Sequence, residues 1–236
     1  MDGRVVIVTG STRGIGLALA RDCASRGARV VIHGRDRARI DEIVRMLRAG
    51  GRDAMGIPAD LATSSGADAL VRRTIEAHGR VDVLVNNAAA TTPRAPLWRI
   101  DPLELEAVVA TNLLGPILCA RALLAWAVPR SEAARIINVS SDATVTPRAH
   151  AAGYAATKAG LEGFTRALAL DAAVTEVVVT AIALPGHRTE LSRDMVSPQE
   201  YAGLAPPEAA VANLLFAMTA PRDEVHGRVI GVPPPR

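Results

Sequence analysis

Residues 4–16 read RVVIVTGSTRGIG, an apolar run that ends in a glycine-rich turn. The run predicts a buried strand, and the pattern that follows the turn predicts a helix. Gly10, Gly14 and Gly16 stand where a side chain would block the turn, the approach of backbone N–H groups to a phosphate, or helix–strand packing. Glycine spacing alone is weak, so the flanking strand and helix carry the inference. We expect a dinucleotide-binding turn; the alternative is a glycine-rich turn without a ligand.

The alternation of apolar runs and amphipathic stretches continues along the chain. Strands are predicted at 4–10, 28–34, 53–59, 81–87, 134–140, 176–184 and 227–232. Helices are predicted at 14–26, 36–49, 64–78, 102–127, 151–172 and 207–219. Strands that alternate with helices imply right-handed crossovers and a parallel sheet covered on both faces. We therefore expect one doubly wound α/β domain over residues 1–236, built on a seven-stranded parallel sheet.

Composition narrows the class of protein. The sequence pI is about 9.4, but the net charge is only +3, aromatic residues make up 3%, and arginines are dispersed among acids, which argues against a nucleic-acid partner. Cys23 and Cys119 form no CxxC or Cys/His cluster, so we expect small buried hydrophobes and no metal site. No signal peptide is recognisable and no apolar stretch reaches spanning length, so we expect a cytoplasmic protein without a membrane partner.

Lys158 is the single lysine among 27 basic residues. Tyr154 precedes it by four positions, so on a helix both side chains face one cleft. A neighbouring ammonium favours the phenolate, and we expect it to lower the pKa of Tyr154 below its usual value of about 10. Arginine has a broad planar fork and cannot replace a compact ammonium here. The alternative is an exposed Tyr/Lys pair on a helix surface.

Three motifs in this order resemble the short-chain dehydrogenase/reductase family. They are TGSTRGIG at 9–16, NNAA at 86–89 and Tyr154-x-x-x-Lys158, and the likeness covers about residues 3 to 184. The last residue of NNAA is commonly glycine in that family. The resemblance implies a Rossmann fold, a nicotinamide cofactor and chemistry between a carbonyl and an alcohol.

The resemblance also assigns catalytic roles. Ser141 lies thirteen residues before Tyr154 and would hydrogen-bond the substrate carbonyl, while Tyr154 would supply the proton. Lys158 would hold the nicotinamide ribose, and Asn112 would anchor a water of the proton relay. Ser140 is the rival to Ser141, although it points to the opposite side if strand alternation persists. Asn112 could instead bond to neighbouring backbone.

The residues after the second predicted strand bear on the choice of cofactor. Arg35 would pair with a ribose 2′-phosphate and Arg13 offers a second cation, whereas Asp36 would suit a free 2′-hydroxyl. We therefore expect NADPH, with NAD(H) as the alternative. The remaining cofactor contacts that the resemblance implies are Gly10, Ser11, Gly14, Ile15, Gly16, Asp60, Leu61, Asn87, Ala88, Ala89, Tyr154 and Lys158.

The stretch AIALPGHRTE at 181–190 departs from the family pattern, with Leu184 at the usual proline and Pro185 at the usual glycine. The loop on the nicotinamide side is therefore expected to be altered. His187 is expected to be solvated rather than catalytic. Residues 186–207 are expected to form a short lid over the substrate. Its candidate contacts are Met195 and Tyr201.

These observations favour an NADPH-dependent oxidoreductase that reduces a ketone to a secondary alcohol, and the resemblance suggests a 3-oxoacyl thioester, free or carrier-bound. An NAD-linked secondary alcohol dehydrogenase is the first alternative. A non-catalytic dinucleotide-binding regulatory protein and a purely structural module are the others. By resemblance, helices 102–127 and 151–172 pair with their copies in a homodimer or homotetramer. The C-terminal GVPPPR lacks the glycine pair often found there, which favours the dimer.

Overall fold

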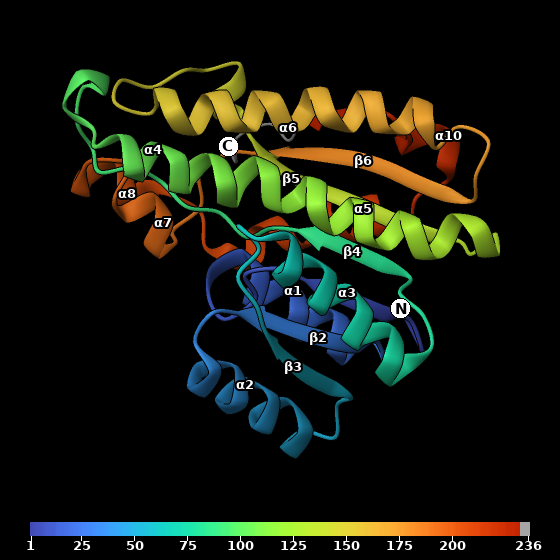
Figure 1. Cartoon of the computed structure of the whole chain (residues 1–236). Helices are drawn as coiled ribbons and strands as arrows, with labels where there is room; N and C mark the ends of the chain where they lie inside the picture. Colours follow the sequence, from blue (N-terminus) through green and yellow to red (C-terminus); the bar gives the residue numbers. More distant parts are fainter. Residues whose placement is uncertain (232–236) are drawn as a thin grey trace.

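A seven-stranded sheet forms the centre of the computed structural model, which describes residues 1–231 (Figure 1). The strand order is β3-β2-β1-β4-β5-β6-β7, and every neighbouring pair is parallel. The strands are β1 Val5–Val8, β2 Arg29–Gly34, β3 Ala54–Pro58, β4 Val83–Asn86, β5 Ala134–Ser141, β6 Val177–Leu184 and β7 Val229–Gly231. The predicted doubly wound sheet is confirmed; the end of its last predicted strand, residue 232, and most of GVPPPR lie outside the described residues.

Helices cover both faces of this sheet. The longer ones are α1 Gly14–Ser25, α2 Arg37–Ala49, α3 Ser64–His78, α4 Pro102–Val109, α5 Gly115–Ala127, α6 Ala152–Asp171 and α9 Val211–Thr219. The short ones are α7 Glu190–Arg193, α8 Pro198–Gly203 and α10 Arg222–Val225, which the sequence patterns did not predict. Helices α1, α2 and α9 share one core cluster, and α3, α5 and α6 share the other.

Strand β1 shows why the sheet is buried on both sides. Val6 and Val8 pack in the cluster with α1, whereas Ile7 packs in the opposite cluster. All three side chains are fully buried. Because successive side chains of a strand point to opposite faces, a strand covered on both faces must be apolar throughout. The continuous run that predicted the fold is therefore a direct consequence of two helical layers.

The sheet also fixes where a ligand can bind. Strand β1 pairs with β2 on one side and with β4 on the other. The order in which successive strands are added to the sheet therefore reverses at β1. In open α/β sheets, ligands bind in the crevice outside the carboxyl ends of the strands at such a switch point. The glycine turn after β1 lies at this point.

The predicted helix 102–127 is interrupted, which corrects the sequence interpretation. Residues Ala110–Leu114 form a π-turn between α4 and α5. Pro116 follows in the first turn of α5 and has no amide hydrogen, so the carbonyl of Asn112 has no i+4 donor. A π-turn of this kind is frequent at functional sites.

The helical stretch Pro102–Arg130, 29 residues long, has the length and apolar composition to cross a membrane. The prediction that no apolar stretch reaches spanning length is therefore wrong by that criterion. One such helix is weak evidence for a span, since a core helix of a soluble protein passes the same test. Its side chains Cys119 and Leu123 are fully buried against the sheet, while 39% of its most apolar window is buried in this chain.

Both cysteines behave as the sequence predicted. Cys23 on α1 and Cys119 on α5 are buried and unpaired. Burial raises the pKa of each thiol to about 12. They therefore act as small apolar core residues.

Candidate active site

The glycine turn packs directly against the loop that follows β4. Gly10 has φ +64°, and a Cβ there would lie 2.8 Å from the Cα of Ala88. A Cβ on Gly16 would lie 2.5 Å from Nδ2 of Asn87. The hydroxyl of Thr9 accepts hydrogen bonds from the backbone N–H groups of Asn87 and Ala88, both at 2.9 Å. Both glycines are thus required by this close approach.

A buried histidine supports the turn from behind. The backbone N–H of Gly10 donates to Nδ1 of His33 at 3.1 Å, so Nε2 carries the proton and donates to the carbonyl of Ala59 at 3.2 Å. Burial lowers the pKa of His33 to about 4, which keeps the ring neutral. Ser11 is fully buried, and its hydroxyl accepts from the N–H of His33 at 3.0 Å. The structure therefore places Ser11 behind the turn. The sequence had predicted it as a cofactor contact in the cleft, and this prediction is wrong.

A cleft of about 770 Å³ opens at the carboxyl ends of the strands. It joins the glycine turn, the ends of β2, β4 and β5, helix α6 and the segment after β6. The predicted residues that line it are Gly10, Arg13, Gly14, Ile15, Gly16, Arg35, Asp60, Leu61, Asn87, Ala88, Ala89, Ser141, Tyr154 and Lys158. Its size and place are those of a cofactor site with room for a substrate.

The end of the cleft near β2 gathers cations. Arg35 and Arg39 both line it, and Arg39 in the first turn of α2 was not identified from the sequence. Asp36 also lines the cleft, but its carboxylate caps α2 by accepting from the N–H of Arg39 at 3.1 Å. Arg13 in the glycine turn forms an exposed ion pair with Glu190 of α7. Asp36, whose carboxylate favoured NAD(H) as the alternative cofactor, therefore caps helix α2.

Tyr154 and Lys158 lie together in the cleft and are only 7% and 2% exposed, which excludes the exposed-pair alternative. The Lys158 ammonium donates to the carbonyl of Val139 at 2.8 Å and lies 5.7 Å from the centroid of the Tyr154 ring. Burial lowers the pKa of Lys158 to about 8. Burial also raises the pKa of Tyr154 to about 12; Ser141 acts to lower that pKa, and the charge of Asp142 raises it. The predicted lowering of the Tyr154 pKa is wrong here, because desolvation of the phenolate outweighs the lowering by Ser141.

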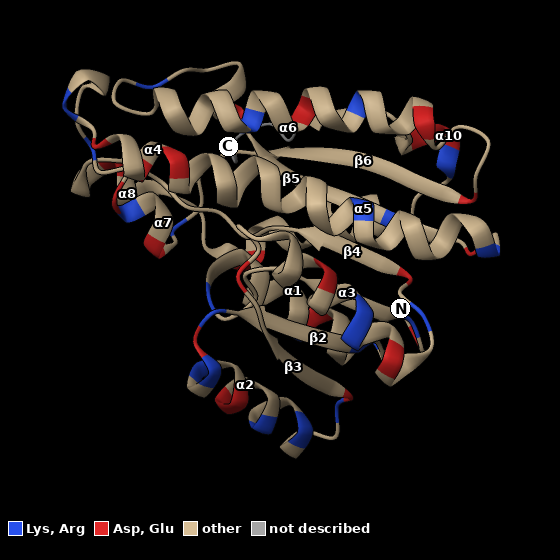
Figure 2. Cartoon of the chain, in the orientation of Figure 1, with Lys and Arg blue, Asp and Glu red and all other residues tan. Residues whose placement is uncertain are grey.

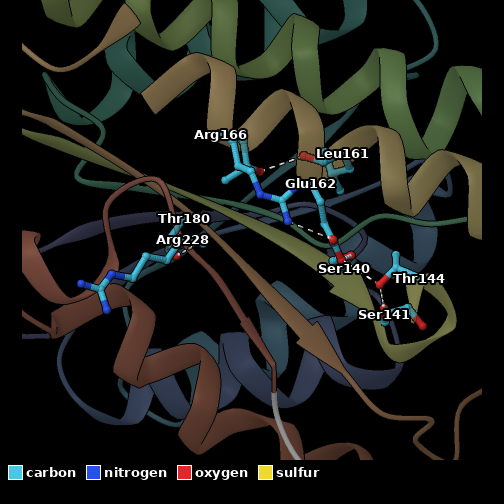
Figure 3. Close-up of polar contacts among 9 residues, drawn as sticks. Ser140, Ser141, Thr144, Leu161, Glu162, Arg166, Thr180 and Arg228 are labelled. Atoms are coloured by element: carbon cyan, nitrogen blue, oxygen red, sulfur yellow. Dashed lines mark hydrogen bonds and ion pairs between the residues drawn. The ribbon is translucent and has the colours of Figure 1, made fainter. Parts of the chain in front are cut away.

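The two candidate serines at the end of β5 point to different partners. The hydroxyl of Ser141 donates to the carboxylate of Asp142 at 3.1 Å and accepts from the N–H of Ala143 at 3.1 Å. The hydroxyl of Ser140 donates to Glu162 of α6 at 2.7 Å (Figure 3). Ser140 is buried and donates its proton to the carboxylate of Glu162, whereas Ser141 is half-buried; both serines line the cleft.

Asn112 is fully buried in the π-turn and does not line the cleft. Its Oδ1 accepts from the N–H of Ala90 at 2.7 Å, and its Nδ2 donates to the carbonyl of Ala90 at 2.9 Å. Nδ2 also lies 3.2 Å from the hydroxyl of Thr157 on α6. The side chain therefore bonds to the backbone of a distant loop, rather than to neighbouring helix backbone as the alternative interpretation held, and fixes the loop after β4 against α6.

The segment after β6 differs from the expectation. His187 is 5% exposed rather than solvated, and its Nδ1 donates to the carbonyl of Pro185 at 2.8 Å. The hydroxyl of Ser192 on α7 donates to the backbone carbonyl of His187. Met195 lines the cleft, as proposed from the sequence. Tyr201 lies outside the lining and stacks against the guanidinium of Arg193, 5.5 Å from its ring centroid.

Comparisons with known proteins agree with this geometry. The family model for short chain dehydrogenase matches residues 4–200. The chain is 33% identical to the cis-4-hydroxycyclohexanecarboxylate dehydrogenase of Sinomonas cyclohexanicum, over 97% of this chain and 94% of that protein. It is 32% identical to a 3-oxoacyl-acyl-carrier-protein reductase of Synechocystis sp., over 94% and 91% of the two chains. A variant of actinorhodin polyketide ketoreductase, solved with NADPH, superposes with a TM-score of 0.88 at 29% identity, over 98% and 97% of the chains. This chain belongs to the short chain dehydrogenase family.

Proposed function

We propose that this protein is an NADPH-dependent reductase that converts a ketone to a secondary alcohol. The observation that carries the proposal is the burial of Tyr154 and Lys158 side by side in a cleft that also contains the glycine turn and Ser141. The likeness to a 3-oxoacyl reductase and to a ketoreductase solved with NADPH supports it.

The residues of the cleft fit this cofactor. A Cβ on Gly10 would fill the space beside Ala88, so the turn leaves its backbone open to a pyrophosphate at the N-terminus of α1. Arg13, Arg35 and Arg39 would pair with the ribose 2′-phosphate. When bound, the reduced nicotinamide supplies the hydride. NAD(H) is the second candidate, because Asp36 still lines the same end of the cleft.

The protonation states favour reduction. With its pKa raised to about 12, Tyr154 holds its proton at neutral pH and can donate it to the carbonyl oxygen as that oxygen gains charge. The hydroxyl of Ser141 turns from Asp142 to donate to the same oxygen. Lys158 stabilises the phenolate that remains. The carbonyl of Asn112, which has no i+4 donor because of Pro116, accepts a water that returns the proton.

Alcohol oxidation with NAD is the alternative function, and the likeness to a hydroxycyclohexanecarboxylate dehydrogenase favours it. Oxidation would need Tyr154 to begin as phenolate. Its raised pKa makes that form scarce at neutral pH. A non-catalytic dinucleotide-binding protein would not require the buried ammonium, which lowers stability. The reductive direction therefore agrees better with the site.

The substrate class follows from the same relatives. A 3-oxoacyl thioester, free or carrier-bound, fits the likeness to the Synechocystis reductase. Residues 186–207, with α7 and α8, form a lid on the single domain of the chain, and Met195 contacts the substrate below it.

We also place the protein in the cytoplasm as a homo-oligomer. The exposed apolar side chains of Leu103 and Val109 on α4 and of Leu114 in the π-turn support pairing with a second copy. Figure 2 shows long uncharged stretches on the visible side of α5. Such a face is covered at low cost by its own symmetry mate.

The test is a panel of ketones assayed for NADPH and NADH consumption with wild type and Tyr154→Phe. We expect NADPH turnover, and a loss of about 100-fold or more in kcat for Tyr154→Phe with unchanged NADPH affinity, because the proton donor is removed. Tyr201→Phe is the matched control, since the only other tyrosine lies outside the cleft. Tight cofactor binding without turnover on any ketone would favour the non-catalytic alternative, and full activity of Tyr154→Phe would refute the assigned role.

A further inference from the structure

The proposed mechanism leaves one buried carboxylate of α6 without a role. Glu162 follows Lys158 by one helical turn and Tyr154 by two, and it is 8% exposed. One oxygen, Oε1, accepts from the hydroxyl of Ser140 at 2.7 Å and from the hydroxyl of Thr144 at 3.0 Å (Figure 3). Glu162 therefore joins the catalytic helix to two residues near the end of β5.

These two hydroxyls lie on either side of Ser141. Ser140 precedes it on β5, and Thr144 ends the single 3-10 turn, Asp142–Thr144, that follows it. The hydroxyl of Thr144 also lies 2.9 Å from the carbonyl oxygen of Ser141, so its one proton is shared between that oxygen and Glu162. The backbone on both sides of Ser141 is thus held by one side chain of α6.

The burial of Glu162 makes these contacts strong. A buried carboxylate must be hydrogen-bonded, and bonds to an ionised acceptor are shorter and stronger than neutral ones. Its one ion pair among residues 1–231 is with Arg166, whose Nη2 lies 3.6 Å from Oε2 and whose side chain is 58% exposed. The hydroxyls of Ser140 and Thr144 therefore provide most of the hydrogen bonding that compensates for the desolvation of the Glu162 carboxylate.

A neighbouring contact shows what docking of α6 alone requires. One turn further on, the hydroxyl of Thr165 accepts from Nδ2 of Asn138 at 2.9 Å, also between α6 and β5. That hydrogen bond is fully buried and lies within the strand, three residues before Ser141. It holds the same two elements together without touching the Ser141 turn. A variant at Thr165 therefore separates the packing of α6 against β5 from the positioning of Ser141.

We infer that Glu162 is a positioning residue for the reaction: it fixes the turn that carries Ser141 against the helix that carries Tyr154 and Lys158. The inference rests on the proposed function, because its catalytic consequence requires that Ser141 and Tyr154 act on one substrate oxygen. Glu162 itself does not line the cleft in the described part of the chain.

The experiment compares Glu162→Leu, Glu162→Gln and Thr165→Val in the full chain. We expect Glu162→Leu to lower kcat by about 10- to 100-fold, because a displacement of about 1 Å at a reacting group costs that much. NADPH affinity should stay within about twofold, and the isotope effect with deuterated NADPH should rise. Glu162→Gln should recover most of kcat, since its amide oxygen accepts the same hydroxyls. Thr165→Val should lose thermal stability but keep kcat.

Hydrogen exchange provides a readout that does not depend on activity. The N–H groups of Val145 and Thr146 donate to the carbonyl of Asp142, and they should exchange faster in Glu162→Leu than in Thr165→Val. If wild type reduces no ketone, the proposed function fails. Hydrogen exchange alone then tests whether Glu162 fixes the position of the turn that carries Ser141. Unchanged exchange, or equal kcat losses in Glu162→Leu and Thr165→Val, would overturn the inference. If Glu162→Leu does not fold, Ser140→Ala/Thr144→Val replaces it with the same expectations.

Discussion

Lys158 illustrates at the scale of one residue how function opposes stability. Burial lowers its pKa from 10.5 to about 8, so the folded chain binds this proton less tightly than the unfolded chain. Between pH 8 and 10.5 the unfolded state holds more protons, and the contribution to stability rises with pH. Below pH 8 the buried ammonium costs about 3 kcal/mol, and this cost is constant there.

Replacing Lys158 by methionine should therefore stabilise the protein and inactivate it. At pH 7 we expect a gain of about 1–2 kcal/mol, since loss of the bond to Val139 offsets part of the gain. The gain should shrink towards pH 10.5, and kcat should fall by about 100-fold or more. Thermal unfolding at pH 7 and 10, with Arg121→Met as an exposed control, measures this. A Lys158→Met protein that is less stable than wild type at pH 7 would contradict the stated cost of burial.

At the scale of elements, the glycine turn and α7 meet through one ion pair. Arg13 and Glu190 have side chains that are 67% and 57% exposed, so the pair itself adds little stability. The location of this ion pair matters more than its contribution to stability. Glu190 places a carboxylate beside Arg13, the cation that we assign to the 2′-phosphate. We therefore expect α7 and the cofactor to compete for Arg13.

Glu190→Gln should improve the use of NADPH without affecting NADH. We expect KM for NADPH to fall by about two- to threefold, since an exposed, screened charge is removed near the phosphate. Steady-state kinetics with both cofactors measures the difference, and Glu76→Gln on α3 serves as a distant control of equal charge. Equal changes in KM for NADPH and NADH would show that Glu190 does not act on the 2′-phosphate end.

At the scale of the whole molecule, apolar side chains of α4 and of the π-turn that follows it are exposed to solvent in the single chain. Leu103, Val109 and Leu114 are 70%, 47% and 42% exposed along this helical stretch. We propose that these exposed apolar side chains mark an interaction site. A second copy that meets this face through a twofold axis would bury both patches at once.

Leu114→Glu should therefore dissociate the oligomer. A carboxylate at the centre of a desolvated interface is left unpaired, so we expect monomers and a lower midpoint of thermal unfolding. Light scattering coupled to size exclusion measures the mass, and Val174→Glu, at an exposed loop position, is the control. A monomeric wild type would contradict the pairing, and a Leu114→Glu protein of unchanged mass would place the interface elsewhere.

The sequence by itself determined the sheet, its longer helices apart from the break at Ala110–Leu114, and most of the residues that line the cleft. Runs such as Val5–Val8 predict a strand buried on both faces because local periodicity reports how many sides of an element avoid water. Tyr154 and Lys158 face one cleft because four positions on a helix share a side. The end of β5 brings Ser141 to the same edge, since parallel strands end together. These relations depend on spacing along one chain segment.

Only the tertiary structure decided the properties that arise between segments. The direction of the Tyr154 pKa follows from how deeply neighbouring elements bury it, and no spacing reveals that depth. His33 supports Gly10, and Glu162 holds Ser140, through contacts between residues 22 or 23 positions apart. The partner of Asn112 is likewise 22 positions away. Desolvation and long-range hydrogen bonds are set by packing, so the sequence alone left these features undetermined.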